Sequence, residues 1–128
     1  MKPSKVMVVE DDPDIQKVIR MALRYQGITD VVTAGSGEEC LTRVDDEKPD
    51  VILMDVMMPR MDGYETCRHL KAGRTTSHIP VIFLTAKAQQ YEKQLGFQAG
   101  AVGYLIKPFD PMTLWDQIRG ILDDGATE

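Results

Sequence analysis

The chain alternates five short apolar runs with longer stretches of helical periodicity, and this alternation limits its possible folds more than any other feature. The apolar runs cover residues 5–9, 30–34, 51–54, 81–84 and 102–105. They are rich in Val and Ile and almost continuous, which is typical of parallel strands covered on both faces. The sequence therefore predicts an α/β fold in which right-handed crossovers build a doubly wound, five-stranded parallel sheet with helices on both faces.

Local signals mark where two of the helices begin. Asp12 followed by Pro13 predicts an N-cap and a proline at the first helical position. Asp110 followed by Pro111 repeats this signal and predicts the start of the last helix.

Length and composition predict one domain over residues 1–128, with a core over about 5–122 and a frayed polar tail at 123–128. The opening residues and the polar tail favour a stand-alone domain over a piece of a longer regulator or hybrid kinase. A net charge of −5 without a Lys and Arg cluster argues against direct nucleic-acid binding. The chain shows no secretory signal and no bilayer-spanning apolar stretch, so we expect no membrane insertion and a cytoplasmic location.

Polar side chains follow four of the five predicted strands at the point where each strand ends. Glu10 and Asp11 follow the first strand and Asp55 the third, while Thr85 and Lys107 follow the fourth and the fifth. Because chemistry in such folds gathers at the carboxyl ends of the strands, we expect these five side chains to converge. Three acids at close range repel one another unless a cation lies among them.

Oxygen ligands with open water positions suit Mg²⁺ better than Zn²⁺, which favours His and Cys. Lys107 offers a compact positive charge for Asp55 or for an arriving phosphate oxygen, and Thr85 offers a hydroxyl donor. The set predicts a carboxylate nucleophile, Asp55, that accepts a phosphoryl group.

The stretch "EDD" offers two acid pairs, Glu10 with Asp11 or Asp11 with Asp12. Pro13 locates the first helical position and so makes Asp12 the cap, which favours the pair Glu10 and Asp11.

Four motifs, "VVEDD", "LMDVMMPRMDG", "LTAK" and "YLIKPF", resemble those of the receiver domain of two-component response regulators. Their order and spacing match across roughly residues 5 to 122. The resemblance implies a flavodoxin-like fold with strand order 2-1-3-4-5. It also implies that Asp55 receives its phosphoryl group from a phosphohistidine on a sensor histidine kinase or histidine phosphotransfer protein.

The resemblance assigns further roles residue by residue. Asp11, Asp55 and the backbone carbonyl of Met57 would bind Mg²⁺, or Mn²⁺ in its place, with Glu10 acting through a water. The motif also matches Thr85 with Tyr104 as a switch pair and Lys107 as a phosphoryl contact. Pro108 would follow a cis peptide bond.

The same resemblance implies an output surface made by the fourth helix, the last strand and the last helix. We expect it to bind a downstream target protein, and it could support a phosphorylation-dependent homodimer. We expect no turnover of external substrates, because position 57 is Met where a phosphohydrolase would carry a second acid. The alternative is a pseudo-receiver, an interaction module that is not regulated by phosphorylation. The complete set of acids, Thr85 and Lys107 argues against that alternative.

Overall fold

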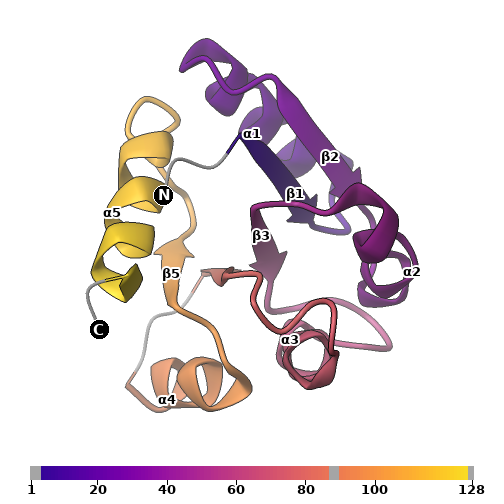
Figure 1. Cartoon of the computed structure of the whole chain (residues 1–128). Coiled ribbons are helices and arrows are strands. Elements are labelled where there is room, and N and C mark those ends of the chain that lie inside the picture. The colour runs from indigo at the N-terminus through magenta and orange to yellow at the C-terminus, as the bar shows by residue number, and fades with distance from the viewer. Residues whose placement is uncertain (1–3, 87–89, 127–128) are drawn as a thin grey trace.

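The computed structural model of the chain describes residues 4–86 and 90–126, in which strands and helices alternate (Figure 1). The strands are β1 (Lys5–Val9), β2 (Asp30–Ala34), β3 (Val51–Asp55), β4 (Val81–Thr85) and β5 (Gly103–Ile106). The helices are α1 (Pro13–Tyr25), α2 (Gly37–Glu47), α3 (Gly63–Ala72), α4 (Gln90–Ala99) and α5 (Leu114–Ala126).

All strand pairs are parallel, and the strands lie in the order β2-β1-β3-β4-β5. This order confirms the predicted doubly wound fold. Because β1, β3 and β4 each have a strand on both sides, their residues are almost all buried. Because the strands are parallel, their carboxyl ends lie at one edge of the sheet, and the predicted site residues lie at this edge.

Two layers of helices cover the sheet. Helices α2, α3 and α4 pack on one face and form what we name the α2–α4 layer, and α1 with α5 forms the α1–α5 layer (Figure 1). Successive strand residues point to opposite faces. Thus Phe83 of β4 packs in the α2–α4 layer, and its neighbours Ile82 and Leu84 pack in the α1–α5 layer.

Helix α5 differs from the prediction at both ends. It begins at Leu114 rather than near Pro111, because the Asp110 carboxylate accepts a hydrogen bond from the Met112 amide at 2.9 Å and closes a separate turn. Residues 123–126, which the sequence placed in a frayed tail at 123–128, continue the helix. Each added residue gains a helical hydrogen bond, and the exposed polar side chains stay in water. Residues 127–128 lie outside the described part of the chain.

No described helix has the length and apolar character that a membrane span requires. The longest described helices, α1 and α5, have 13 residues each. Crossing the hydrocarbon core of a bilayer takes about 20 apolar residues.

Candidate functional site

Asp55 is the last residue of β3, and the packing that follows it holds it in place. Its side chain is only 7% exposed. The chain turns back at once, since the Gly63 amide at the start of α3 donates a hydrogen bond to the Val56 carbonyl at 2.9 Å. A Cβ atom on Gly63 would lie 2.3 Å from the Asp55 carbonyl oxygen, a distance that only glycine permits. The start of α3 therefore fixes the backbone of Asp55.

The three predicted acids lie together at this edge of the sheet. Carboxylate oxygens of Glu10, Asp11 and Asp55 all lie within 4.8 Å of one another. Glu10 is 1% exposed, whereas Asp11 is exposed, so the cluster opens to solvent on the Asp11 side. Such a set of oxygen donors suits a hard divalent cation.

Asp12 does not join this cluster. It is the N-cap of α1, and its carboxylate accepts a hydrogen bond from the Asp14 amide at 2.9 Å. Pro13 is the first residue of α1, as the sequence predicted. The geometry therefore agrees with Glu10 and Asp11 as the acid pair.

Lys107 reaches the cluster from the segment that follows β5. Its Nζ atom lies 2.7 Å from Glu10 Oε1 and 3.3 Å from Asp55 Oδ1. The backbone amide of Lys107 donates to the Thr85 carbonyl at 2.7 Å, which ties this segment to the end of β4. The peptide bond between Lys107 and Pro108 is cis, in the conformation that the resemblance implies. The sequence pointed to Asp55 as the carboxylate partner of this lysine, yet Glu10 is the closer one.

Burial and charge set the protonation of the site. Burial raises the pKa of Glu10 to about 8, and the neighbouring Asp55 carboxylate adds to the shift while Lys107 opposes it. Burial alone would lower the pKa of Lys107, but its hydrogen bond with Glu10 and the charge of Asp55 raise it above its usual value. Full ionisation of the three acids is thus unfavourable unless a further cation is bound.

This shift predicts a pH dependence of stability in the metal-free protein. With a chelator present, Glu10 should make the free energy of unfolding fall as the pH rises from 4.5 to about 8. The folded chain keeps a proton that the unfolded chain has already lost, so the contribution is full below the lower pH and is lost as the pH rises through the folded pKa. Urea unfolding at a series of pH values checks this, with Glu10→Gln as the control. A Glu10→Gln variant with the same pH profile as the wild type would contradict the prediction.

Thr85 lies on β4, the neighbour of β3 on the side away from β1, and Tyr104 lies on β5, the next strand outward. Thr85 ends β4 and is paired in register with Ile106, and Tyr104 is paired with Phe83. Thr85 and Tyr104 both line a small cavity beneath α4. The structure therefore brings the two predicted switch residues to the same cavity.

Met57 follows Asp55 by two residues, and its backbone lies close to the acid cluster. Its amide donates a hydrogen bond to Asp55 Oδ1 at 3.3 Å, and its side chain is 79% exposed. The main chain here is close enough to take part in the site, while the side chain contributes no acid or amide.

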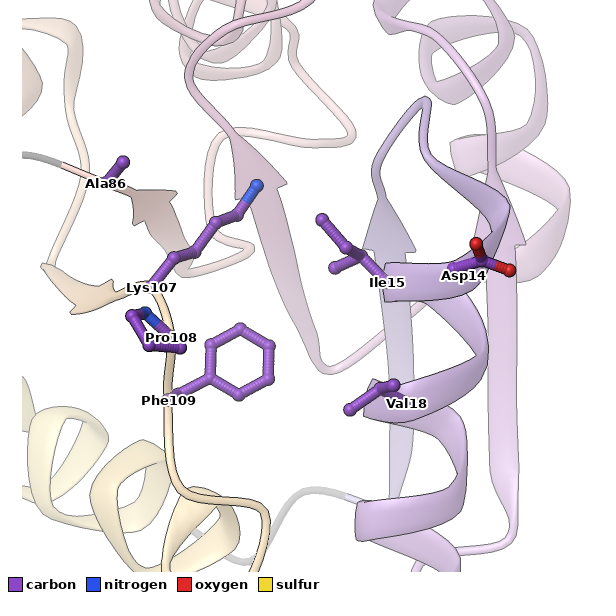
Figure 2. Close-up of a pocket in the computed structure, with 7 residues that line it drawn as sticks. All are labelled: Asp14, Ile15, Val18, Ala86, Lys107, Pro108 and Phe109. Atoms are coloured by element: carbon purple, nitrogen blue, oxygen red, sulfur yellow. The ribbon is translucent and has the colours of Figure 1, made fainter.

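An apolar pocket of about 480 Å³ lies beside Lys107, between α1 and the segment after β5. Figure 2 shows the Phe109 ring turned toward Ile15 and Val18 of α1, while the Lys107 side chain points away from that ring. Sequence reasoning missed this pocket, because it depends on two segments about 90 residues apart.

Sequence reasoning also missed Tyr64, which faces the same cavity as Thr85 and Tyr104. Its ring meets Phe83 edge to face at a centroid distance of 5.2 Å, and its hydroxyl donates to the Glu92 carbonyl of α4 at 3.5 Å. In the sequence, Tyr64 is an apolar position of a helix that begins after the Asp62 cap. Such a position indicates packing in general and does not reveal the contact with Glu92.

The chain is similar to known proteins over most of its length. A family model described as the response regulator receiver domain matches residues 6–119. The alkaline phosphatase synthesis transcriptional regulatory protein PhoP of Bacillus subtilis is 39% identical over 118 residues, 92% of this chain and 48% of that protein. The DNA-binding response regulator MtrA of Mycolicibacterium smegmatis is 37% identical over 92% of this chain and 50% of that protein. The chain thus spans about half the length of these curated relatives.

Two solved structures share the fold over nearly their full lengths. The chemotaxis protein CheY4 of Vibrio cholerae superposes with a TM-score of 0.87 at 32% identity, covering 94% of this chain and 99% of that one. The signal receiver domain of a signal transduction histidine kinase from Syntrophus aciditrophicus gives a TM-score of 0.82 at 29% identity, covering 94% and 91%.

Proposed function

The chain belongs to the family of response regulator receiver domains, and from this premise we propose that Asp55 accepts a phosphoryl group from a phosphohistidine. One observation carries the proposal. The buried Asp55 carboxylate lies where Glu10, Asp11 and Lys107 meet. A buried acid surrounded by other acids and one ammonium is costly unless it serves a charged ligand.

The donor set fits a divalent cation, Mg²⁺ or Mn²⁺. Asp11 and Asp55 would hold it directly, together with the backbone carbonyl of Met57, and Glu10 would act through a water. When bound, such an ion offsets the negative charge of the phosphoryl oxygens. The support is the close approach of three carboxylates of which one, Asp11, is open to solvent.

In the proposed transfer, a carboxylate oxygen of Asp55 attacks phosphorus while the phosphorus–nitrogen bond to the donor imidazole breaks. The products are an acyl phosphate on Asp55 and an imidazole whose freed nitrogen keeps the bonding electron pair, and the ring is neutral because its other nitrogen carries a proton during the transfer. Lys107 Nζ, now 3.3 Å from Asp55 Oδ1, would pair with a phosphoryl oxygen. The exposure of Asp11 leaves a side from which the donor can approach.

The phosphoryl group would then act through Thr85 and Tyr104. New oxygens on Asp55 attract the Thr85 hydroxyl, and Tyr104 occupies the space beneath α4. The change would reach the surface made by α4, β5 and α5, which we propose binds a downstream target protein or a second copy of the chain. The support is the cavity that Thr85 and Tyr104 share.

The proposed donor is a sensor histidine kinase or a histidine phosphotransfer protein, and the apolar pocket beside Lys107 offers it a contact surface. We propose that the chain works in the cytoplasm, without direct contact to nucleic acid or insertion into a membrane. It turns over no external substrate, because Met57 supplies no second acid. A pseudo-receiver role is not favoured, since the acids, Thr85 and Lys107 are all present at one edge of the sheet.

Transfer of radioactive phosphate from a phosphohistidine donor tests the proposal. We expect the chain to take up label when Mg²⁺ is present and to lose this uptake when a chelator is added, because the charge of the three acids is then unopposed. A chelator-treated sample to which Mg²⁺ is returned should recover, which controls for damage to the donor. Label uptake that is equal with and without the chelator would contradict the metal requirement, and no uptake in any condition would contradict the function.

A further inference from the structure

Helix α4 lies close against the sheet at Gly96. A Cβ atom at this position would lie 3.1 Å from Phe83 Cδ2 and 3.3 Å from Tyr104 Cε1. Carbon atoms in good contact lie about 3.5–4.0 Å apart, so a side chain here would force α4 or one of the rings to move. Glycine is also a poor helix former, and its place inside α4 therefore calls for a packing reason. The two ring contacts supply that reason.

The Tyr104 ring is enclosed by α4 rather than held by hydrogen bonds. Its centroid lies 5.4 Å from that of Phe97, and Lys93 Nζ lies 5.9 Å from the ring centroid. Within the described part of the chain, the Tyr104 hydroxyl oxygen is buried and has no hydrogen-bond partner. A buried hydroxyl without a partner is unfavourable, so among the described residues it is packing that keeps the ring in place.

These two observations make the inward ring sensitive to small changes in the distance between α4 and β5. Packing favours the ring beneath α4, and the unpartnered hydroxyl disfavours it. When two contributions oppose each other in this way, altering one of them changes the fraction of molecules in which the ring lies inward. The contact at Gly96 is one that a single methyl group would alter.

We propose that Gly96 is a positioning residue for Tyr104: its missing side chain lets α4 close over the ring and keeps the ring beside Thr85. In a chain with any other residue at position 96, the ring turns outward more often. Because Thr85 ends the strand next to Asp55, the position of the ring then responds less to a group on Asp55. This last step rests on the proposed function, whereas the effect on the ring does not.

The matched pair Gly96→Ala and Gly120→Ala tests the proposal. Gly120 lies in α5, and a Cβ atom there would meet nothing within 4 Å. Both substitutions improve helix propensity equally, so they differ only in what the new methyl group contacts. Neither residue belongs to the acid cluster.

The first measurement uses no ligand. In protein labelled with ¹³C-tyrosine, the ring signal of Tyr104 is assigned by its loss in Tyr104→Phe, and its exposure is read from the relaxation caused by a soluble paramagnetic agent. We expect a severalfold increase of this relaxation in Gly96→Ala and no change in Gly120→Ala. Equal relaxation in Gly96→Ala and wild type would overturn the proposal.

The second measurement follows binding of a beryllofluoride–Mg²⁺ complex, which mimics a phosphoryl group on a carboxylate, by calorimetry. We expect Gly96→Ala to weaken binding roughly threefold to tenfold and Gly120→Ala to leave it unchanged. In a Tyr104→Ala background the same Gly96→Ala change should have no effect, because its target ring is gone. A weakening that persists in that background would show a merely structural role and overturn the proposal. If the wild type binds no complex, the proposed function fails, and the ring measurement decides on Gly96 alone.

Discussion

Replacing Asp55 with asparagine is expected to abolish the uptake of labelled phosphate from a phosphohistidine donor. The amide keeps the shape of the carboxylate but lacks the anionic oxygen that attacks phosphorus. Glu10 lies 2.7 Å from Lys107 Nζ without the help of Asp55, so we expect the contact that ties β1 to the segment after β5 to persist in the variant. The loss should therefore reflect the missing nucleophile and not an unfolded chain.

Asp30→Asn is a matched control for this experiment. Asp30 is exposed at the start of β2, on the opposite edge of the sheet from the strand ends that carry the site. It should take up label like the wild type, and the bound label should be released under the mild conditions that hydrolyse acyl phosphates. Labelled Asp55→Asn protein would show that another residue is the acceptor.

Replacing Gly63 with alanine is expected to produce the largest loss of stability of any substitution considered for this chain. The new Cβ would lie 2.3 Å from the Asp55 carbonyl oxygen and 2.9 Å from the Val56 Cα. Both atoms belong to the backbone of a buried segment and cannot rotate away, unlike a flexible side chain. We expect the free energy of unfolding to fall by roughly 3 kcal/mol, measured by urea denaturation.

The alanine variant at Gly120 provides the comparison, because its methyl group meets nothing within 4 Å. It should be about 0.5–1 kcal/mol more stable than the wild type through better helix propensity. If Gly63→Ala and Gly120→Ala unfold at the same urea concentration, α3 does not constrain the backbone of Asp55 as the structure indicates.

The meeting of Asp55 with Glu10, Asp11 and Lys107 was predictable because it follows from a parallel sheet, whereas the strand order was implied only by the resemblance to receiver domains. In a parallel doubly wound sheet, the residue after each strand must lie at one edge, whatever the details of packing. Hydrophobic runs located those strand ends to within a residue, as at β5, which spans Gly103–Ile106 where the sequence predicted 102–105.

Quantities that depend on distances between packed segments could not be predicted. The sequence did not show that Lys107 lies closer to Glu10 than to Asp55, because this depends on how the segment after β5 turns. The close approach at Gly96 depends on the separation of α4 from the sheet. The start of the last helix was mispredicted because an aspartate before proline caps an isolated turn as readily as a helix.

The alternation of side chains along β4 and β5 has a consequence for how such a molecule can change over evolutionary time. Phe83 and Tyr104 belong to the face that we expect to respond to the signal, while Ile82, Leu84 and Leu105 anchor the opposite face. Substitutions beneath α4 can therefore change the response to phosphorylation while the packing against α1 and α5 stays intact. Substitutions that change partner specificity then fall on the residues beneath α4. Selection for a stable fold acts on the residues of the same two strands that face α1 and α5.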